Sequence, residues 1–516
     1  MANFFLKKDV NRLIADVAVG NETGHRLKRT LGPFNLIMLG VGAIIGAGIF
    51  SLTGTAAANY AGPGIVYSFI IGGILCAFAG LCYAEMAAMV PVSGSAYAYS
   101  YATLGELIAW IIGWDLILEY AFGSVTVATS WSGYFCSLLT KTMGIQVSDE
   151  WIRLTKGPWE LVTLSDGSQV LGWWNLPATL VSLGLAGILY RGIQESAFIN
   201  NLIVVVKLAI ILSFIALGWA VIDPLHWIGN SEVTGLARLV PPASMALRNG
   251  REVMSFGWPG VLTGAGVVFF AYIGFDAIST TAQECKNPSR DLPIGILVSL
   301  IACTILYILM ALVLTGVVPY QQLGVPDPIA VGVDRIVSLR GWSEGGQKIF
   351  SFVVKIGALA GLTSVILVLM LGQTRIIYAM AKDGLLPWFD HLSKRFSTPD
   401  VATFATGLFV ATCAGLLPMS LVGELVSIGT LLAFVLVCVG IPILRIKNPN
   451  IHRPFKTPFY WLVAPLGALS CFWVMTGLPR DTWIRLVVWL FIGFCIYFGY
   501  SSKHSKLRIE REGTQK

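Results

Sequence analysis

The sequence predicts an all-α integral membrane protein with twelve transmembrane helices, and three observations lead to this fold class. Of its 516 residues, 55% are hydrophobic and only 12% are charged, whereas an ordinary soluble domain is about 25% charged. The hydrophobic residues fall in long blocks, and residues 202–221 and 421–444 each contain a single charged residue. A run of about 20 apolar residues matches the roughly 30 Å thickness of the bilayer hydrocarbon core. We therefore expect a chain embedded in the lipid bilayer.

The composition also excludes several classes of protein. The net charge of +7 is explained by the lysines and arginines that membrane proteins keep on cytoplasmic loops, so no nucleic-acid partner is expected. The nine cysteines are scattered without a C-x-x-C pair, and the five histidines lie in predicted loops or tails. Cysteines inside apolar blocks act as small hydrophobic residues. We expect no disulfide framework, no metal, no cofactor and no enzymatic centre.

Each predicted helix follows an apolar block. The first 30 residues are polar and lack the apolar region of a cleavable signal peptide. Residues 151–173 contain Gly157-Pro158 and Asp166-Gly167, which predict an outer loop with turns and a hairpin. The predicted helices cover residues 33–57, 62–89, 104–139, 174–190, 198–221, 256–282, 292–318, 349–381, 402–418, 421–444, 459–478 and 482–500.

The distribution of positive charge predicts the orientation. If the N-terminus is inside, the segments on its side carry about twice as many lysines and arginines as the segments on the other side. Membrane proteins keep this excess in the cytoplasm. We therefore expect a multi-pass protein of the plasma (inner) membrane with both termini cytoplasmic.

Two predicted helices contain glycine clusters. Residues 40–48 hold four glycines and residues 264–274 hold three. Because glycine costs a helix interior about 1 kcal/mol relative to alanine, these clusters are a poor way to build a plain helix. One explanation is close helix packing, since Gly42 and Gly46 have the small-xxx-small spacing. The other is that both helices are interrupted, near residues 44–48 and 267–270.

The position of the clusters favours interruption. They lie five helices apart, and an odd repeat length inverts the second copy in the membrane. Paired interrupted helices in two inverted halves mark the midplane site of a transporter. The expected divisions are a cytoplasmic segment (1–30), a first repeat (31–221), an extracytoplasmic loop (222–255), a second repeat (256–445), two further helices (446–500) and a cytoplasmic tail (501–516).

Interrupted helices also suggest a substrate. The exposed N–H groups at one half-helix end suit a carboxylate, and the carbonyls at the other end suit an ammonium. An α-amino acid carries both groups on one carbon. The expected partners are therefore an amino acid and the lipid bilayer, and protons are added by the ionisable residues considered next. No oligomeric state follows from the sequence.

Ionisable residues inside the helices are candidates for function, because charge in mid-bilayer is costly. Lys207 stands alone in the fifth helix, and it either exchanges a proton or holds helix-end carbonyls. Glu119 lies one turn from Asp115 in the third helix and either meets a cationic substrate or handles protons. Asp276 follows the second glycine cluster, where it either pairs with Lys207 or caps a half-helix. Glu85 lies near a helix end and is expected to snorkel or to form an interfacial pair.

Four motifs make the chain resemble the amino acid–polyamine–organocation transporter superfamily, within it the cationic amino acid transporter branch. The resemblance covers roughly residues 28–500. Each motif alone is weak, but their combination is specific. The motifs are G-A-I-I-G-A-G-I-F at 42–50; Y-A-E-M at 83–86 with P-x-S-G-S-x-Y at 91–97; residues 269–276 with E-x-x-N-P-x-R-x-x-P at 284–293; and G-Q-T-R at 372–375 with D-G-L-L-P at 383–387.

The resemblance implies a five-plus-five inverted repeat of the kind first defined in bacterial leucine transporters, with broken helices 1 and 6, two extra helices and alternating access. The substrate carboxylate would meet the amides of Gly46, Ala47 and Gly48. The amino group would meet carbonyls of Ile44, Val267 and Phe270, and Phe270 would close over the substrate. Lys207 would replace the sodium ion of distant relatives and, with Asp276, couple transport to protons.

The expected substrate is a cationic amino acid such as arginine or lysine, which Glu119 favours. A smaller neutral amino acid is the second possibility, because the bulky Leu362, expected in the pocket wall, would exclude a long side chain. Ala47 stands where many relatives carry serine or threonine. Twelve helices rather than the fourteen of vertebrate members favour a bacterial-type permease. The alternative mechanism is an exchanger of amino acids, amines or polyamines.

Overall fold

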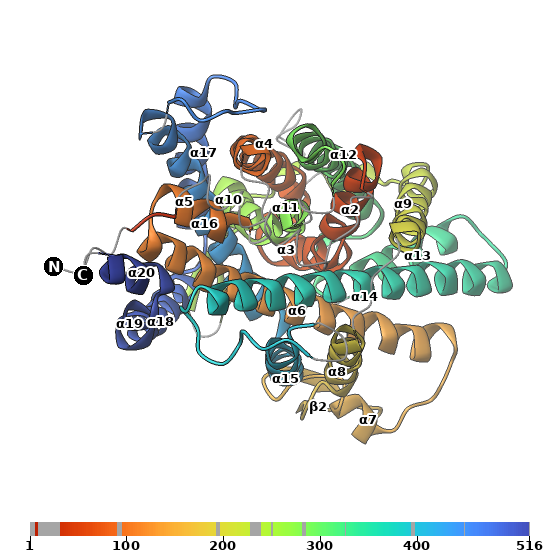
Figure 1. The fold of residues 1–516 in the computed structure, drawn as a ribbon. Coiled ribbons are helices and arrows are strands. Elements are labelled where there is room, and N and C mark those ends of the chain that lie inside the picture. Colours follow the sequence, from red (N-terminus) through yellow and green to blue (C-terminus); the bar gives the residue numbers. More distant parts are fainter. Residues whose placement is uncertain are drawn as a thin grey trace.

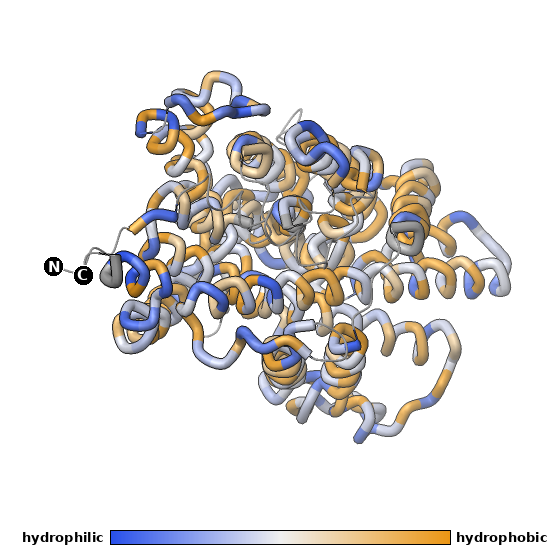
Figure 2. Tube along the Cα trace, in the orientation of Figure 1, coloured by the Kyte–Doolittle hydropathy of each residue, from blue (hydrophilic) through white to orange (hydrophobic). Residues whose placement is uncertain are grey.

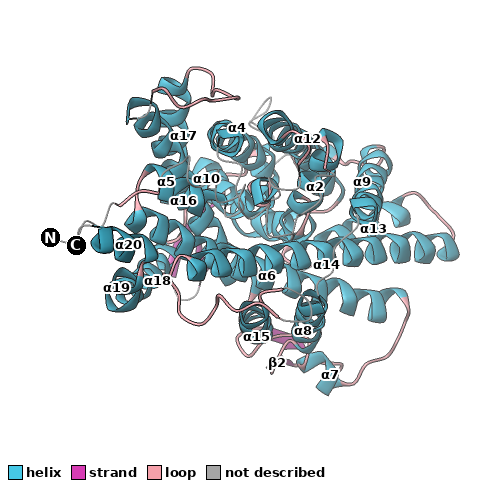
Figure 3. Ribbon diagram, viewed as in Figure 1, coloured by secondary structure: helices cyan, strands magenta, loops and turns pink. Residues whose placement is uncertain are grey.

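The computed structural model describes residues 6–8, 31–89, 95–191, 197–227, 239–248, 251–280, 285–325, 327–393, 398–447 and 449–514. Helices dominate, and the only named strands in these residues form two short antiparallel hairpins (Figures 1 and 3). The helices are α2 (Pro33–Ile44), α3 (Thr53–Ala56), α4 (Ile65–Met89), α5 (Ser95–Thr103), α6 (Glu106–Ser137), α7 (Asp149–Arg153), α8 (Leu176–Arg191), α9 (Ala197–Trp219), α10 (Gly257–Val268), α11 (Ala277–Thr280), α12 (Pro288–Val317), α13 (Pro328–Leu339), α14 (Glu344–Lys382), α15 (Asp400–Leu416), α16 (Met419–Lys447), α17 (Tyr460–Thr476), α18 (Arg480–Ile496), α19 (Ser502–His504) and α20 (Lys506–Thr514). The strands are β1 (Leu161–Thr163), β2 (Gln169–Leu171), β3 (Ser244–Arg248) and β4 (Arg251–Ser255).

The apolar blocks of the sequence become helices. Each of the twelve predicted segments coincides with a helix or, for the first and sixth, with a helix broken into parts. Among the described residues, seven helical stretches are long and apolar enough to cross a membrane, and the first of these, Pro33–Met89, joins two predicted segments. Helices α8, α15 and α17 and the stretch Gly257–Tyr272 are shorter apolar helices.

Helices α6 and α14 form the long axis of the molecule and lie side by side (Figure 1). With 39 residues, α14 is about 58 Å long at 1.5 Å per residue, nearly twice the hydrocarbon thickness. Its length therefore carries it beyond a bilayer, as the long eighth block predicts. The broken helix α2 packs against α12 and α9, and α4 packs against α12 and α10.

The outer surface of the helices is apolar. Large side chains such as Phe404, Leu469 and Phe491 are about two-thirds exposed or more, on α15, α17 and α18. Figure 2 shows hydrophobic residues along the helices and hydrophilic stretches mainly in the connecting segments. Exposed apolar surface on this scale marks contact with an apolar phase. The multi-pass membrane protein predicted from composition is thus what the fold presents.

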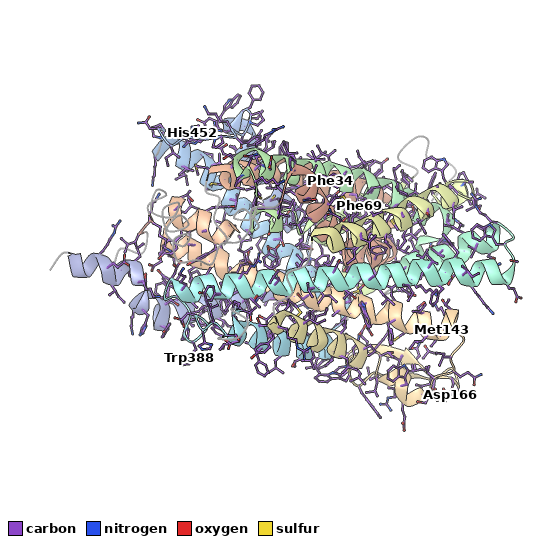
Figure 4. All side chains as sticks on the ribbon, turned by 45° about the vertical axis from the view of Figure 1, so that its right-hand side comes forward. Phe34, Phe69, Met143, Asp166, Trp388 and His452 are labelled. Carbon is purple, nitrogen blue, oxygen red and sulfur yellow. The ribbon has the colours of Figure 1, made fainter. Side chains whose placement is uncertain are left out.

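The two ends of the bundle differ. One end, the terminal end, carries residues 6–8, α20 and His452; the other, the loop end, carries Met143, Asp166 and the β1–β2 hairpin (Figure 4). Lys8 and the backbone of Lys506 both contact Asp383. The described ends of the chain thus lie together, as predicted, while the compartment that they face stays a prediction.

The loop segments contain structure that the sequence only partly indicated. The hairpin expected in residues 151–173 is present as β1–β2, with Gly167 in the turn at φ +82°. The β3–β4 hairpin and α13 were not expected. Helix α13 is amphipathic, with Asp334 and Arg335 between apolar residues, so it contains no long apolar run of the kind that marked the other helices.

Candidate functional site

The first predicted interruption is confirmed. Helix α2 ends at Ile44, and Ile45 is extended with ψ 90°. A single π-helical turn begins again at Gly48, and the Phe50 N–H donates to the Gly46 carbonyl at 3.2 Å. Because the first N–H groups of a helical segment have no partner within it, the N–H groups around residues 46–48 are the ones left for a carboxylate.

The second interruption begins within the predicted range and extends a few residues beyond it. Residues 267 and 268 are still helical, Phe269–Tyr272 form a 3-10 turn, and the extended residue is Ile273. Gly274 follows with φ +117°, a conformation that L side chains rarely adopt. The predicted range of 267–270 thus contains the end of α10 and the start of the 3-10 turn but misses the extended residue, because Gly264 and Gly266 serve packing instead, against Ser68 and Leu478.

The two interruptions touch each other through their backbones. A Cβ atom on Gly48 would lie 2.2 Å from the Ala271 Cα, and one on Gly274 would lie 2.9 Å from the Ala43 carbonyl carbon. Gly40 and Gly46, by contrast, make close contact with the side chains of Ser299 and Val365. The first cluster therefore serves both purposes weighed from the sequence: some glycines pack helices, and Gly48 lets the broken segments meet.

Tyr307 on α12 joins the two interruptions. Its hydroxyl lies 2.7 Å from the Ile44 carbonyl and 2.8 Å from the Ala271 carbonyl. A tyrosine has one O–H to donate, so only one of these carbonyls receives its proton at a time. Sequence reasoning missed Tyr307, because a single tyrosine in an apolar helix is a weak signal.

Lys207 on α9 contacts the first interruption. Its fully buried ammonium donates to the carbonyls of Gly42 (2.9 Å) and Ile45 (3.1 Å). On its other side, Gly361 of α14 leaves room for the lysine stem, since a Cβ there would lie 2.8 Å from the Lys207 Cε. The lysine thus replaces hydrogen bonds that the helix lost when it broke.

Asp276 is hydrogen-bonded to α6 and to the second interruption. The Asp276 carboxylate accepts hydrogen bonds from the Tyr120 hydroxyl (2.6 Å) and the Gly274 N–H (3.2 Å). Asp276 precedes α11, so the capping position weighed from the sequence is the one it occupies.

Glu119 and Asp115 are buried on α6 near this second interruption. Tyr120, the neighbour of Glu119, donates to Asp276. One Glu119 oxygen and both Asp115 oxygens have no hydrogen-bond partner among the described residues. Buried carboxylates without partners are unusual, so this acidic cluster is a candidate for holding protons or a cationic group.

The other residues that were predicted to contact the substrate are buried as well. The Phe270 ring lies 3.9 Å from the Cβ position of Gly123 on α6, where Leu369 and Val426 also approach. The Val267 carbonyl accepts a long hydrogen bond of 3.4 Å from Ser427. All of the predicted substrate-contacting residues are buried: Ile44, Gly46, Ala47, Gly48, Glu119, Val267, Phe270 and Leu362.

Of the other motif residues, Glu85 forms the interfacial pair that was expected. It accepts two hydrogen bonds from Arg445, at 2.9 and 2.6 Å, and one from the Thr457 N–H. Residues 91–94 and Glu284 lie outside the described residues.

Two broken helices in contact, the first of them hydrogen-bonded to a buried lysine of α9, are typical of a membrane transporter. The chain belongs to the amino acid permease family, whose profile matches residues 31–500. The resemblance drawn from the motifs is thereby confirmed, and the chain is a transporter and not an enzyme.

Three curated relatives illustrate the range of this family. The chain is 44% identical to a branched-chain amino acid permease of Bacillus subtilis (strain 168), over 98% of both chains. It is 40% identical to a methylthioribose transporter of the same organism, over 98% of this chain and all of that one. It is 35% identical to a vacuolar cationic amino acid transporter of Arabidopsis thaliana, over 86% of this chain and 64% of the relative.

Proposed function

We propose that this chain transports an α-amino acid as a proton-coupled secondary transporter, with twelve transmembrane helices in a five-plus-five inverted repeat. The observation that carries the proposal is the contact between the two interruptions at Gly48 and Ala271. It brings the N–H groups of residues 46–48 close to the carbonyls of the second break. A carboxylate and an ammonium on one carbon fit such a pair of half-helix ends.

The carbonyls of Ile44 and Phe270 already accept hydrogen bonds within the protein, but each can accept one more from a ligand. The Ile44 carbonyl faces Tyr307, and the Phe270 carbonyl accepts from the Ile273 N–H at 3.2 Å. A carbonyl oxygen has two lone pairs and can accept a second hydrogen bond. Ile44, Val267 and Phe270 therefore remain the proposed acceptors for the substrate ammonium.

The side chains around Phe270 favour a neutral, branched aliphatic substrate. Leu369, Val426 and the Phe270 ring all approach the Cβ position of Gly123, and Leu362 is fully buried on α14. An apolar wall gains from apolar substrate surface and offers a guanidinium no partner. The branched-chain permease among the relatives supports the same reading.

A cationic amino acid is the second candidate. Glu119 is buried with one oxygen that lacks a partner, and it lies one turn before Gly123 on α6. A basic side chain that passes Phe270 would reach it. The cationic amino acid transporter among the relatives supports this alternative.

The buried position of every proposed contact residue indicates a closed form of the transport cycle. In the proposed cycle this closed form lies between a form open to one side of the plasma membrane and a form open to the other. Both termini are proposed to lie in the cytoplasm. Protonated Lys207 holds the first interruption through the Gly42 and Ile45 carbonyls. Loss of its proton would release this contact and favour another form, which couples the proton to the substrate.

Uptake into proteoliposomes tests the proposal. Labelled L-leucine and L-arginine are compared under an imposed pH gradient, with methylthioribose as an unlabelled competitor. Accumulation of leucine that collapses with the gradient supports the first candidate, and the same result for arginine, lost in Glu119→Gln, supports the second. Uptake only into vesicles preloaded with an amino acid or polyamine would show exchange. No transport of either amino acid would overturn the proposal.

A further inference from the structure

A cavity of about 230 Å³ lies at the loop end of the bundle, outside the predicted site. Its polar lining comes from the end of α6, the loop after α7, the start of α8 and the residue before α13: Ser137, Lys141, Lys156, Glu160, Asn175 and Asp327. The volume of the cavity exceeds that of several water molecules, at about 30 Å³ each. It is smaller than the roughly 300–1,000 Å³ of pockets that bind drug-sized ligands. It therefore suits a small solute.

The lining carries two positive and two negative side chains that are not paired directly. Neither Lys141 nor Lys156 lies within 4.0 Å of a carboxylate oxygen among the described residues. Asp327 is only 6% exposed, and its Oδ2 has no hydrogen-bond partner in the described part of the chain. The buried Ser137 hydroxyl lies close enough to Asp327 to lower the pKa of that carboxyl, but the two form no hydrogen bond of normal geometry. Unpartnered buried polar groups that line a cavity indicate an interaction still to be made.

The charges of the cavity select the chemistry of its occupant. Burial raises the pKa of the Asp327 carboxyl, and the nearby Lys141 opposes that rise. Burial also raises the pKa of Glu160, against Lys156. A bound ammonium would stabilise the ionised form of Asp327, and a bound carboxylate would meet Lys141. A ligand with only one of these charges would pair with Asp327 or with Lys141 but not with both.

The wall of the cavity is also hydrogen-bonded to the segment that follows the first interruption. Tyr134, less than one turn before Ser137 on α6, donates to the Phe50 carbonyl at 2.7 Å. Ser130 on the same helix is hydrogen-bonded to Ser51. Helix α6, which forms part of the cavity wall, is thus held by hydrogen bonds to the helical turn that follows the first interruption.

From these observations we infer that the cavity is a second, peripheral site for a zwitterionic α-amino acid, with Asp327 facing the ammonium and Lys141 the carboxylate. The inference rests on the proposed function and adds to it a first binding position at the loop end. Cys136, which lines the cavity, provides a local readout of occupancy.

The experiment measures alkylation of Cys136 by N-ethylmaleimide in the full-length protein in nanodiscs, quantified by peptide mass spectrometry. Cys413 on α15, outside the cavity lining, is the internal reference. L-leucine or L-arginine should slow alkylation of Cys136 about five-fold when the site is mostly filled. Isocaproate lacks the ammonium and isoamylamine lacks the carboxylate, so neither should protect.

Asp327→Asn and Lys141→Met should abolish the protection, while Asp166→Asn and Lys348→Met, which replace exposed residues, should keep it. If Asp327→Asn does not fold, the exposed Lys141 still provides the test. Absent protection in the wild-type protein, equal protection by isocaproate, or protection that survives Lys141→Met would overturn the inference. Uptake measured on the same preparation keeps the two proposals apart. Uptake without protection removes only this site, and protection without uptake removes only the proposed transport function.

Discussion

At the residue scale, Lys207 is the charged residue in direct contact with the first interruption. It is fully buried, and its ammonium bonds two carbonyls that α2 can no longer satisfy. The structure shows the contact expected of a structural lysine, and the proposed coupling adds that the contact is broken when the proton leaves. A variant that keeps the stem but not the charge separates these roles.

Lys207→Met should eliminate pH-driven accumulation and reduce substrate binding less. Methionine retains the apolar stem beside Gly361 but cannot carry a proton. Uptake under an imposed pH gradient and binding measured by thermal stabilisation are the two readouts. Lys348→Met, at an exposed position on α14, is the control. If Lys207→Met still concentrates substrate with the gradient, the lysine is structural, and Glu119 or Asp276 becomes the leading proton carrier.

Phe270 is the second residue with a defined expectation. Phe270→Ala removes an apolar cover worth about 1.5–3 kcal/mol if fully buried, and each 1.4 kcal/mol is about ten-fold in affinity. The apparent KM for the transported amino acid should therefore rise about ten-fold or more. Phe404→Ala, on the exposed face of α15, should leave KM unchanged. An unchanged KM in Phe270→Ala would move the cover to Phe269 or Tyr272.

At the scale of elements, the contact between the interruptions depends on two glycines. Gly48→Ala places a methyl group against the Ala271 backbone, and Gly274→Ala adds strain of about 1–2 kcal/mol at a positive φ. Both variants should lose amino acid uptake while remaining inserted and monodisperse. Gly184→Ala, where a Cβ meets nothing within 4 Å, should transport normally. Normal uptake in Gly48→Ala would show that the broken segments need not touch.

The elements also show what could be predicted from the sequence. Apolar run length located every described long helix, because a bilayer-sized block has few other uses. The first break was located because glycines at 46 and 48 lie in the interruption itself. The second was located only in part, because Gly264 and Gly266 serve packing whereas Gly274 makes the turn. Tyr307 and Asp327 could not be found, since their roles depend on segments distant in sequence.

At the scale of the whole molecule, a buried network ties the terminal end together. Glu106 accepts hydrogen bonds from Arg508 (2.9 Å), Tyr497 (2.9 Å) and Tyr101 (3.0 Å), and its backbone N–H donates to the Leu6 carbonyl. The network joins the first described segment, α5, α6 and the C-terminal helices. These hydrogen bonds lie at the end of the bundle where both described chain ends are found.

Glu106→Gln should lower the apparent melting temperature clearly, because removing one partner of a buried ion pair costs about 3–5 kcal/mol. Glu344→Gln, at an exposed position in the first turn of α14, should change it little. Thermal unfolding in the same detergent gives the comparison. Equal melting temperatures for Glu106→Gln and the wild-type protein would mean that this network does not stabilise the closed form.

The most direct test of the account is the position of the bound amino acid. A cryo-electron microscopy structure of the protein in nanodiscs, with saturating L-leucine or L-arginine, would show it. The account predicts density between the two interruptions, with the carboxylate at the N–H groups of residues 46–48 and the ammonium at the Ile44, Val267 or Phe270 carbonyls. An amino acid bound away from both interruptions, in a protein that transports it, would contradict the account.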